Sequence, residues 1–188
     1  MDPILSMRLT LSIVLSLSSQ PYASSQAWWD QVREKKDEWY SSAVSYWDDQ
    51  TADNEGVLGG FGQVSPADIM DSRRFLVKSL SERLAAAKEA GEDLVAADCG
   101  AGIGRVSKDL LMHFFQQVDV VEPSEHLLEA ARRNLTPTSS GHRAVNFFRC
   151  GLEKFEPERG RYDALWIQWA LMYLTDDDAV SFLERCAS

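Results

Sequence analysis

The segment VAADCGAGIGR, from Val95 to Arg105, combines an apolar run, an acidic residue and three glycines at alternate positions. An apolar run that leads into a glycine-rich turn is typical of the first strand-to-helix turn of an open α/β sheet. Ligands of such sheets bind beyond the carboxyl ends of the strands, where the turn must let them approach the backbone. We therefore expect a ligand site at Gly100, Gly102 and Gly104.

Short apolar runs alternate with helical patterns in the part of the chain that follows Gly91. Strands are expected at residues 94–98, 118–122, 146–149 and 163–167, and helices at residues 105–115, 124–135 and 176–186. Strands that alternate with helices predict right-handed crossovers and a mostly parallel sheet with helices on both faces. The expected fold class is therefore α/β, with a doubly wound, Rossmann-like sheet.

The best-defined helical pattern precedes the sheet, in residues 65–90. Ser65 is the expected N-cap, and Pro66 is the expected first helical residue. Asp68 completes a capping-box pattern, and Gly91 ends the helix. The sequence thus predicts a long helix at the start of the α/β core.

The chain divides into a Ser-rich leader (1–27), a helical cap with a glycine-rich lid (28–64) and the core (65–188). Residues 28–47 mix aromatic and charged side chains at helical spacing. Residues 56–62 contain four glycines, which predict a loop that is either a mobile lid or a close backbone approach. The length of 188 residues fits one domain with a sizeable core.

The composition bounds the classes of partner. The formal net charge of −10 disfavours nucleic acid and anionic membrane, because both require a basic surface, and it favours a cationic partner. The three cysteines, Cys99, Cys150 and Cys186, form no C-x-x-C pair. They favour reduced thiols over a disulfide frame or a zinc site, so no metal ligand is assigned.

The glycine turn does not have the spacing of a dinucleotide or phosphate loop. The pattern G-x-G-x-x-G requires glycine at position 105, where the chain has Arg105, and G-x-x-x-x-G-K is absent. S-adenosylmethionine fits better, because Asp98 can favour its cationic end and Arg105 can pair with its carboxylate. Glu122 stands 22 positions beyond Gly100 (122 − 100), where doubly wound folds place an acid for ribose hydroxyls. The alternative is a tight turn beside a solvated strand end.

Eight short motifs give the chain a resemblance to a known family. They are SYW (45–47), GVLGGFG (56–62), DSRRFL (71–76), DCGAGIGR (98–105), CGLEKFEP (150–157), YDALWIQW (162–169) and LTDDD with FLERC (174–186). With them the chain resembles the protein alpha-N-terminal methyltransferases over about residues 39–186. These enzymes use S-adenosylmethionine to methylate the terminal amine of proteins that begin X-Pro-Lys or X-Pro-Arg. The resemblance implies a class I methyltransferase fold with an N-terminal helical cap.

The resemblance also implies roles for individual residues. The expected cofactor-binding residues are Asp98, Gly100, Gly102, Arg105, Glu122, Leu152, Glu153, Gln168 and Trp47. The expected substrate-binding residues are Tyr46, Trp169 and Tyr173. For each aromatic residue the alternative is packing in the core, which is the commoner fate of a tryptophan. In an extended segment Trp166 and Gln168 point to one face and Trp169 to the other.

The chain departs from the family pattern at two positions and at its end. Glu153 stands where glutamine is usual, and Tyr173 stands where histidine is usual. The family sheet has seven strands, and here the last three are missing. The acid and amide residues expected nearest the reacting amine would lie beyond Ser188, so no catalytic residue is assigned. The strand at 163–167 would then be an exposed edge through which the chain associates, and we expect this polypeptide to have little or no catalysis.

Three functions follow as hypotheses. The first is methylation of protein N-termini, and the second is a catalytically dead module that binds S-adenosylmethionine or a partner and regulates a full-length relative. The third is a small-molecule methyltransferase. The family and the cysteines favour cytoplasm and nucleus. Residues 7–27 outline a signal or transit peptide, which allows an organelle or secretion, although a disordered leader or a mis-assigned start is the alternative.

Overall fold

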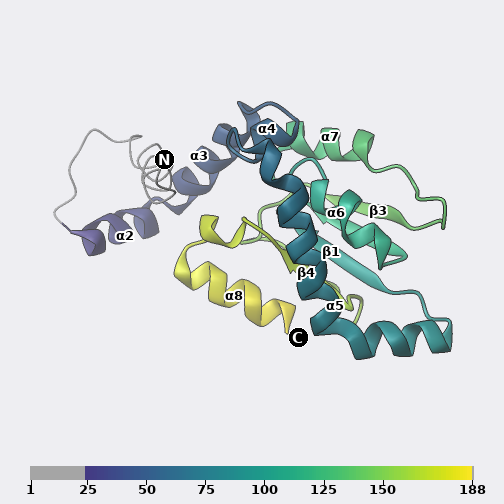
Figure 1. Ribbon diagram of the computed structural model, residues 1–188. Helices are drawn as coiled ribbons and strands as arrows, with labels where there is room; N and C mark the ends of the chain where they lie inside the picture. The colour runs from purple at the N-terminus through teal and green to yellow at the C-terminus, as the bar shows by residue number, and fades with distance from the viewer. Residues whose placement is uncertain (1–23, 188) are drawn as a thin grey trace. The chain divides into compact units, whose positions relative to one another are not determined.

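The computed structural model describes residues 24–187, and within it residues 24–39 and 40–187 form two compact units (Figure 1). The first unit contains helix α2 (Ser25–Glu34), whose N-cap Ser24 accepts a hydrogen bond from the backbone N–H of Ala27. The ring of Trp39 lies edge-on to those of Trp28 and Trp29.

Both ends of the chain carry predictions that the structure does not test. Most of the predicted leader and the terminal Ser188 lie outside the described residues. The division into leader, cap and core therefore stays a prediction.

The segment predicted as a helical cap consists of two helices. Helix α3 (Lys36–Asp48) follows α2 after a break at Lys35. The glycine-rich stretch contains a short helix, α4 (Asn54–Val57), and a 3-10 turn, η1 (Gly62–Val64), so it is less irregular than the predicted loop. Asp53 caps α4 by accepting a hydrogen bond from the backbone N–H of Gly56 at 2.8 Å.

Helix α5 (Ser65–Ala90) begins one residue earlier than expected. The prediction of Ser65 as N-cap is wrong, because η1 runs directly into α5 and Val64 takes the cap position without a side-chain hydrogen bond. The predicted end is confirmed: Gly91 adopts φ 68°, and its N–H bonds to the carbonyl of Ala87. A left-handed residue at this position is the usual place for glycine after a helix.

The sheet has four parallel strands in the order β3-β2-β1-β4. Its strands are β1 (Val95–Cys99), β2 (Gln117–Val121), β3 (Arg143–Phe148) and β4 (Ala164–Ile167). Asp98 pairs in register with Val120 on one side and Trp166 on the other. The predicted α/β fold class is confirmed, and β1 lies inside the sheet where its carboxyl end meets those of β2 and β4.

Helical segments follow β1, β2 and β4, as predicted, whereas the described connection from β3 to β4 contains no helix. The helical segments comprise α6 (Arg105–Asp109), η2 (Leu111–His113), α7 (Glu125–Asn134), η3 (Leu171–Tyr173) and α8 (Asp176–Cys186). The helix expected at 105–115 is divided at Leu110, where α6 ends and a 3-10 turn begins. Ser124 caps α7 and Thr175 caps α8 through their hydroxyl oxygens. None of the helices within residues 24–187 is long and apolar enough to cross a membrane.

Alternate residues of the strands build two hydrophobic layers. Ala96 and Val120 contribute to the layer that includes Leu76 of α5, and α5 lies across this side of the sheet (Figure 1). Ala97 and Val121 contribute to a second layer, which includes Phe182 of α8. The two-residue period of a strand sends neighbouring side chains to opposite faces, so the sheet is covered on both.

The carboxylate of Asp119 is fully buried in the middle of β2. Asp119 of β2 accepts hydrogen bonds from Arg161 (2.8 and 3.2 Å), from the hydroxyl of Tyr162 (2.8 Å) and from the amide of Asn146 (3.0 Å). Burial and this carboxylate raise the pKa of Tyr162. A buried carboxylate needs such partners, and here they tie β2 to β3 and to the segment that enters β4.

Candidate active site

The turn after β1 has the bare backbone that the sequence predicts. Gly100, Gly102 and Gly104 have φ angles of 81°, 56° and 79°, in the left-handed region that favours glycine. A Cβ atom on Gly100 would overlap the side chain of Ala170, which follows β4. A Cβ atom on Gly104 would lie 2.9 Å from Leu135 Cδ1. The turn is therefore closed to side chains and leaves main-chain atoms at the carboxyl end of β1.

Glu122 comes to this turn from the end of β2. Its Oε2 accepts a hydrogen bond from the N–H of Gly102 at 2.8 Å, and its Oε1 accepts one from the N–H of Ser124 at 2.9 Å. Burial outweighs these bonds and raises the pKa of Glu122 from 4.5 to about 7. The structure thus joins the predicted ribose acid to the predicted glycine turn.

Asp98 is buried at the end of β1, beneath the same turn. Its Oδ2 accepts two hydrogen bonds from Ser107, from the backbone N–H at 2.9 Å and from the hydroxyl at 2.7 Å. Burial raises the pKa of Asp98 to about 6. The carboxylate therefore holds α6 against β1, a structural duty that the sequence did not predict.

Arg105 opens α6 with its side chain only 6% exposed. Its Nη2 lies 2.8 Å from Oδ2 of Asp68, and its Nη1 donates to the hydroxyl of Ser65 at 3.2 Å. Both partners come from the first turn of α5. Asp68, which fits a capping box in the sequence, instead pairs with the arginine expected to hold the cofactor.

Gln168 and Trp169 follow β4 and reach the same carboxylate. The amide of Gln168 donates to Oδ2 of Asp68 at 2.7 Å, and the indole N–H of Trp169 donates to Oδ1 at 3.4 Å. Trp166 donates to the amide oxygen of Gln168 at 2.7 Å, so these two side chains share a face as predicted. Trp169 is 65% exposed. Its φ is 60°, and among the described residues other than glycine it is the one with a positive φ.

Three aromatic residues assigned to the site lie together. The rings of Tyr46 and Trp47 are edge-on at 5.1 Å between centroids, and those of Trp47 and Tyr173 at 6.0 Å. Burial, with a smaller effect from Tyr46, raises the pKa of Tyr173. Near neutrality Tyr173 is therefore a protonated phenol that cannot accept a proton.

Leu152 and Glu153 are placed by α8. The guanidinium of Arg185 donates to the carbonyl of Leu152 at 2.9 Å and to that of Glu153 at 3.3 Å. The side chain of Leu152 is buried in the layer that contains Phe182. These two residues lie after β3, and neither is among the hydrogen-bonding partners of Asp68.

Residues 35–188 match the family described as AdoMet-dependent proline di-methyltransferases. The chain belongs to this family. It is 47% identical over 165 residues to alpha N-terminal protein methyltransferase 1 of Arabidopsis thaliana, covering 85% of this chain and 60% of that protein. It is 43% identical over 159 residues to N-terminal Xaa-Pro-Lys N-methyltransferase 1 of Danio rerio, covering 85% and 69%. It spans 50% of the rice relatives that it matches.

Solved structures agree with the family. A SAM-dependent methyltransferase from Leishmania major superposes with a TM-score of 0.66 at 37% identity, covering 79% of this chain and 55% of that one. A protein from Methanococcus maripaludis described as a S-adenosyl-L-methionine-dependent methyltransferase gives a TM-score of 0.50 at 16% identity, covering 72% and 59%. The second likeness concerns the fold alone.

Within this family member, sequence reasoning missed Asp68 as a site residue. The sequence S-P-A-D fits a capping box, but it fits equally well an acid whose side chain faces a neighbouring element. The spacing of the residues alone does not distinguish these two roles of Asp68. The sequence assigned Arg105 to the carboxylate of the cofactor, whereas in the structure its buried guanidinium pairs with a carboxylate of the chain itself. Asp68 is 18% exposed at its side chain and supplies that carboxylate.

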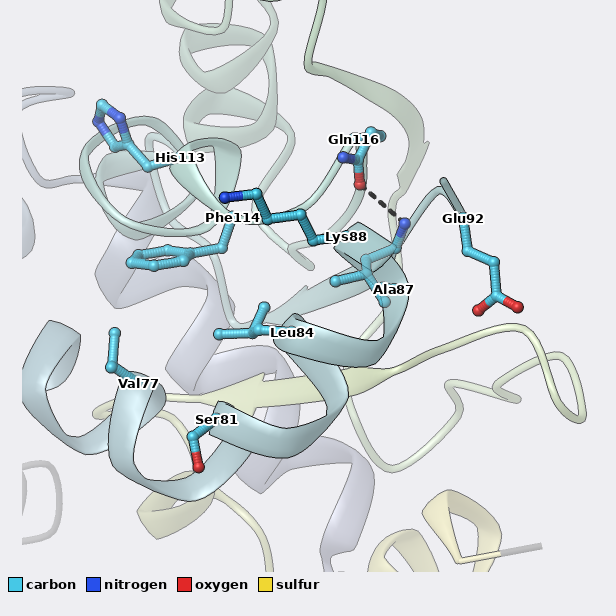
Figure 2. A pocket seen from close by; sticks show the side chains of 10 residues that line it. Val77, Ser81, Leu84, Ala87, Lys88, Glu92, His113, Phe114 and Gln116 are labelled. Carbon is cyan, nitrogen blue, oxygen red and sulfur yellow. Dashed lines mark hydrogen bonds between the residues drawn. The ribbon is translucent and has the colours of Figure 1, made fainter. Parts of the chain in front are cut away.

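A separate cavity of about 470 Å³ lies between α5 and η2. Figure 2 shows Val77, Leu84 and Phe114 around it, with Lys88 and His113 at its sides. None of the site residues named above lines it. This cavity is therefore distinct from the glycine turn and is no part of the candidate site.

Proposed function

We propose that this chain binds S-adenosyl-L-methionine at the turn after β1, and that the protein transfers its methyl group to the α-amino group of proteins that begin X-Pro-Lys or X-Pro-Arg. The observation that carries the proposal is the buried Glu122 carboxylate against the N–H of Gly102 at the carboxyl ends of β1 and β2. Doubly wound sheets bind ligands in the crevice outside the carboxyl ends of their strands. The names of the relatives support the activity and the motif Xaa-Pro-Lys.

The residues present fit the chemical groups of this cofactor. A carboxylate at Glu122 is an acceptor for ribose hydroxyls, and the guanidinium of Arg105 is a donor for the methionine carboxylate. The bare turn at Gly100 and Gly102 allows close approach to the main chain. Leu152 and Glu153 after β3 are the proposed adenine side. When bound, the cofactor supplies an electrophilic methyl group on a sulfonium.

The chain would position an amine in line with that methyl group. An α-amino group has a reference pKa of about 7.7–8.0, so it loses its proton near neutrality with modest help. Gln168 lines the proposed reaction site, and Trp47 and Trp169 form aromatic walls. Such walls attract a methylated cationic amine by about 0.5–2 kcal/mol. The net charge of −10 favours a substrate with a basic third residue.

One observation favours a second candidate, a module that binds without catalysing. Tyr173 stands beside Trp47 with its pKa raised by burial, so it cannot act as a base there. A chain that holds the cofactor but cannot take the proton from the amine would act by binding a partner or regulating a relative.

We also propose that the free edge of β4 pairs with another polypeptide, because β4 pairs only with β1 in the described sheet.

The cofactor is tested by calorimetry with S-adenosyl-L-methionine on the purified chain, alongside circular dichroism. Binding that Arg105→Ala abolishes in a folded chain supports the site, and a folded chain that binds nothing refutes it. An X-Pro-Lys peptide and an X-Ala-Lys control then separate methyl transfer from binding alone. Light scattering over a range of concentrations tests the edge, and a fluorescent fusion tests the proposed residence in cytoplasm and nucleus.

A further inference from the structure

A single carboxylate joins three separate segments of the chain. Asp68 on α5 accepts from Arg105 on α6 at 2.8 Å, and from Gln168 and Trp169 after β4 at 2.7 and 3.4 Å. Under the proposed function, Arg105 belongs to the cofactor side, Gln168 lines the reaction site beside the cofactor, and Trp169 belongs to the substrate side. The two sides of the proposed site therefore meet at one residue that contacts both.

Burial makes the arginine dependent on this contact. The side chain of Arg105 is 6% exposed, and the carboxylate of Asp68 is its ion-pair partner. Removing one member of a buried pair leaves the other charge without compensation. The hydroxyl of Ser65 is a neutral partner that fixes a second nitrogen of the guanidinium at 3.2 Å but does not balance its charge. The direction in which Arg105 points is therefore set largely by Asp68.

The segment after β4 depends on the same carboxylate. The amide oxygen of Gln168 accepts from Trp166 at 2.7 Å and from Ser72 at 3.2 Å, so the amide nitrogen is the end that faces Asp68. Trp169 holds φ 60°, a sparsely populated conformation for a bulky residue. Such conformations persist where the surroundings over-determine them, and the bond from its indole to Asp68 is one of those restraints.

We propose that Asp68 is a positioning residue that holds the cofactor-side Arg105, the reaction-site Gln168 and the substrate-side Trp169 in one arrangement, so that both sides of the site form together. The names cofactor side and substrate side rest on the proposed function, whereas the contacts of Asp68 are independent of it. Asparagine at this position would turn one acceptor oxygen into a donor that faces other donors. The change removes the negative charge and one of the two acceptor oxygens, with little change in volume.

The test compares Asp68→Asn with Asp71→Asn. Asp71 lies on the same helix and forms an exposed ion pair with Arg74, so the control makes the same substitution without touching the site. Hydrogen exchange of the ligand-free chain is followed at residues 100–107 and 166–173, and S-adenosyl-L-methionine affinity is measured by calorimetry. We expect Asp68→Asn to speed exchange in both segments and to weaken cofactor binding by about tenfold or more. Asp71→Asn should change neither.

Two outcomes overturn the proposal: exchange unchanged in both segments, or loosening confined to one of them. Where the wild-type chain binds the cofactor, undiminished affinity of Asp68→Asn overturns it as well. A wild-type chain without cofactor binding refutes the proposed function, and the exchange data still decide the role of Asp68. Should Asp68→Asn fail to fold, Asp68→Glu decides, because it keeps the charge for Arg105 but displaces the carboxylate. Asp68→Glu should speed hydrogen exchange in both segments. Exchange rates equal to those of the wild type in these segments would contradict the proposal.

Discussion

The carboxylate of Glu122 accepts a hydrogen bond from the backbone N–H of Gly102 at 2.8 Å, which links the end of β2 to the turn that follows β1. The contact places a buried acid, whose pKa is raised to about 7, against the glycine turn. The stability of the turn and the ability of Glu122 to accept a hydrogen bond from a ligand therefore both depend on whether the Glu122 carboxyl group is protonated.

Glu122→Gln should flatten the dependence of stability on pH. The folded chain keeps the Glu122 proton at pH values where the unfolded chain has lost it, because the pKa is raised from 4.5 to about 7. Stability is therefore greatest below the lower value and falls as pH rises through the higher one, by on the order of 3 kcal/mol. Urea unfolding between about pH 5 and pH 8 measures this slope.

Glu125→Gln is the control for this experiment, since Glu125 is an exposed residue of α7 that pairs with Arg149. It should leave the slope as in the wild type. Asp98 contributes in the same direction, with its pKa raised to about 6, so Glu122→Gln should reduce the slope without abolishing it. An unchanged slope in Glu122→Gln would show that Glu122 titrates normally in the folded chain.

Arg105→Lys should weaken S-adenosyl-L-methionine binding by about tenfold, because an ammonium keeps the charge but lacks the planar fork that pairs with a carboxylate. Calorimetry measures the affinity. Arg74→Lys is the matched control, since Arg74 forms an exposed ion pair with Asp71 on α5. Equal affinities for the two variants would mean that Arg105 does not contact the cofactor.

Gly100→Ala should destabilise the chain more than Gly60→Ala. Both glycines have a left-handed backbone, with φ 81° and 84°, so both variants bear the conformational penalty of about 1–2 kcal/mol. At Gly60 a Cβ atom would meet nothing within 4 Å, whereas at Gly100 it would overlap Ala170. The difference in the free energy of unfolding measures the overlap, and equal values would show that Ala170 moves aside freely.

Asp119→Asn should destabilise the chain by about 3–5 kcal/mol, because it leaves the partly buried Arg161 without the charge that balances it. Glu158→Gln removes the other carboxylate near Arg161, at 3.8 Å, which is exposed. That control should cost at most about 1 kcal/mol. Urea unfolding of the two variants compares a buried with an exposed partner of one arginine, and similar losses would contradict the assignment.

The sheet and the glycine turn could be predicted because their signals are local. The apolar run before Gly100 and the acid at Glu122 each mark a strand end, and parallel strands bring such ends to one edge. The role of Asp68 could not be predicted, because a contact with a residue 37 positions away (105 − 68) has no local signature. The pattern that suggested capping is genuine in the sequence, but the turn η1 continues into α5 and removes the place for an N-cap.

The cluster around Asp119 was missed for a related reason. An acid between Val118 and Val120 in an apolar strand signals a buried charge, but the identity of its partners depends on how β4 enters the sheet. Arg161 and Tyr162 precede β4 by only two or three residues and become partners once the strand order is known. A lone acid in a buried strand therefore predicts that hydrogen-bonding partners exist, but not which residues they are.

The left-handed backbone of Trp169 has a consequence for how this position responds to selection. A φ of 60° is adopted readily by glycine and tolerated by asparagine, while an indole there is strained. A library randomised at residue 169 and sorted only for thermal resistance should drift toward those two small residues. The same library sorted for capture of an X-Pro-Lys peptide should retain tryptophan, so the divergence between the two populations reports how much folding free energy the protein forgoes for its ligand.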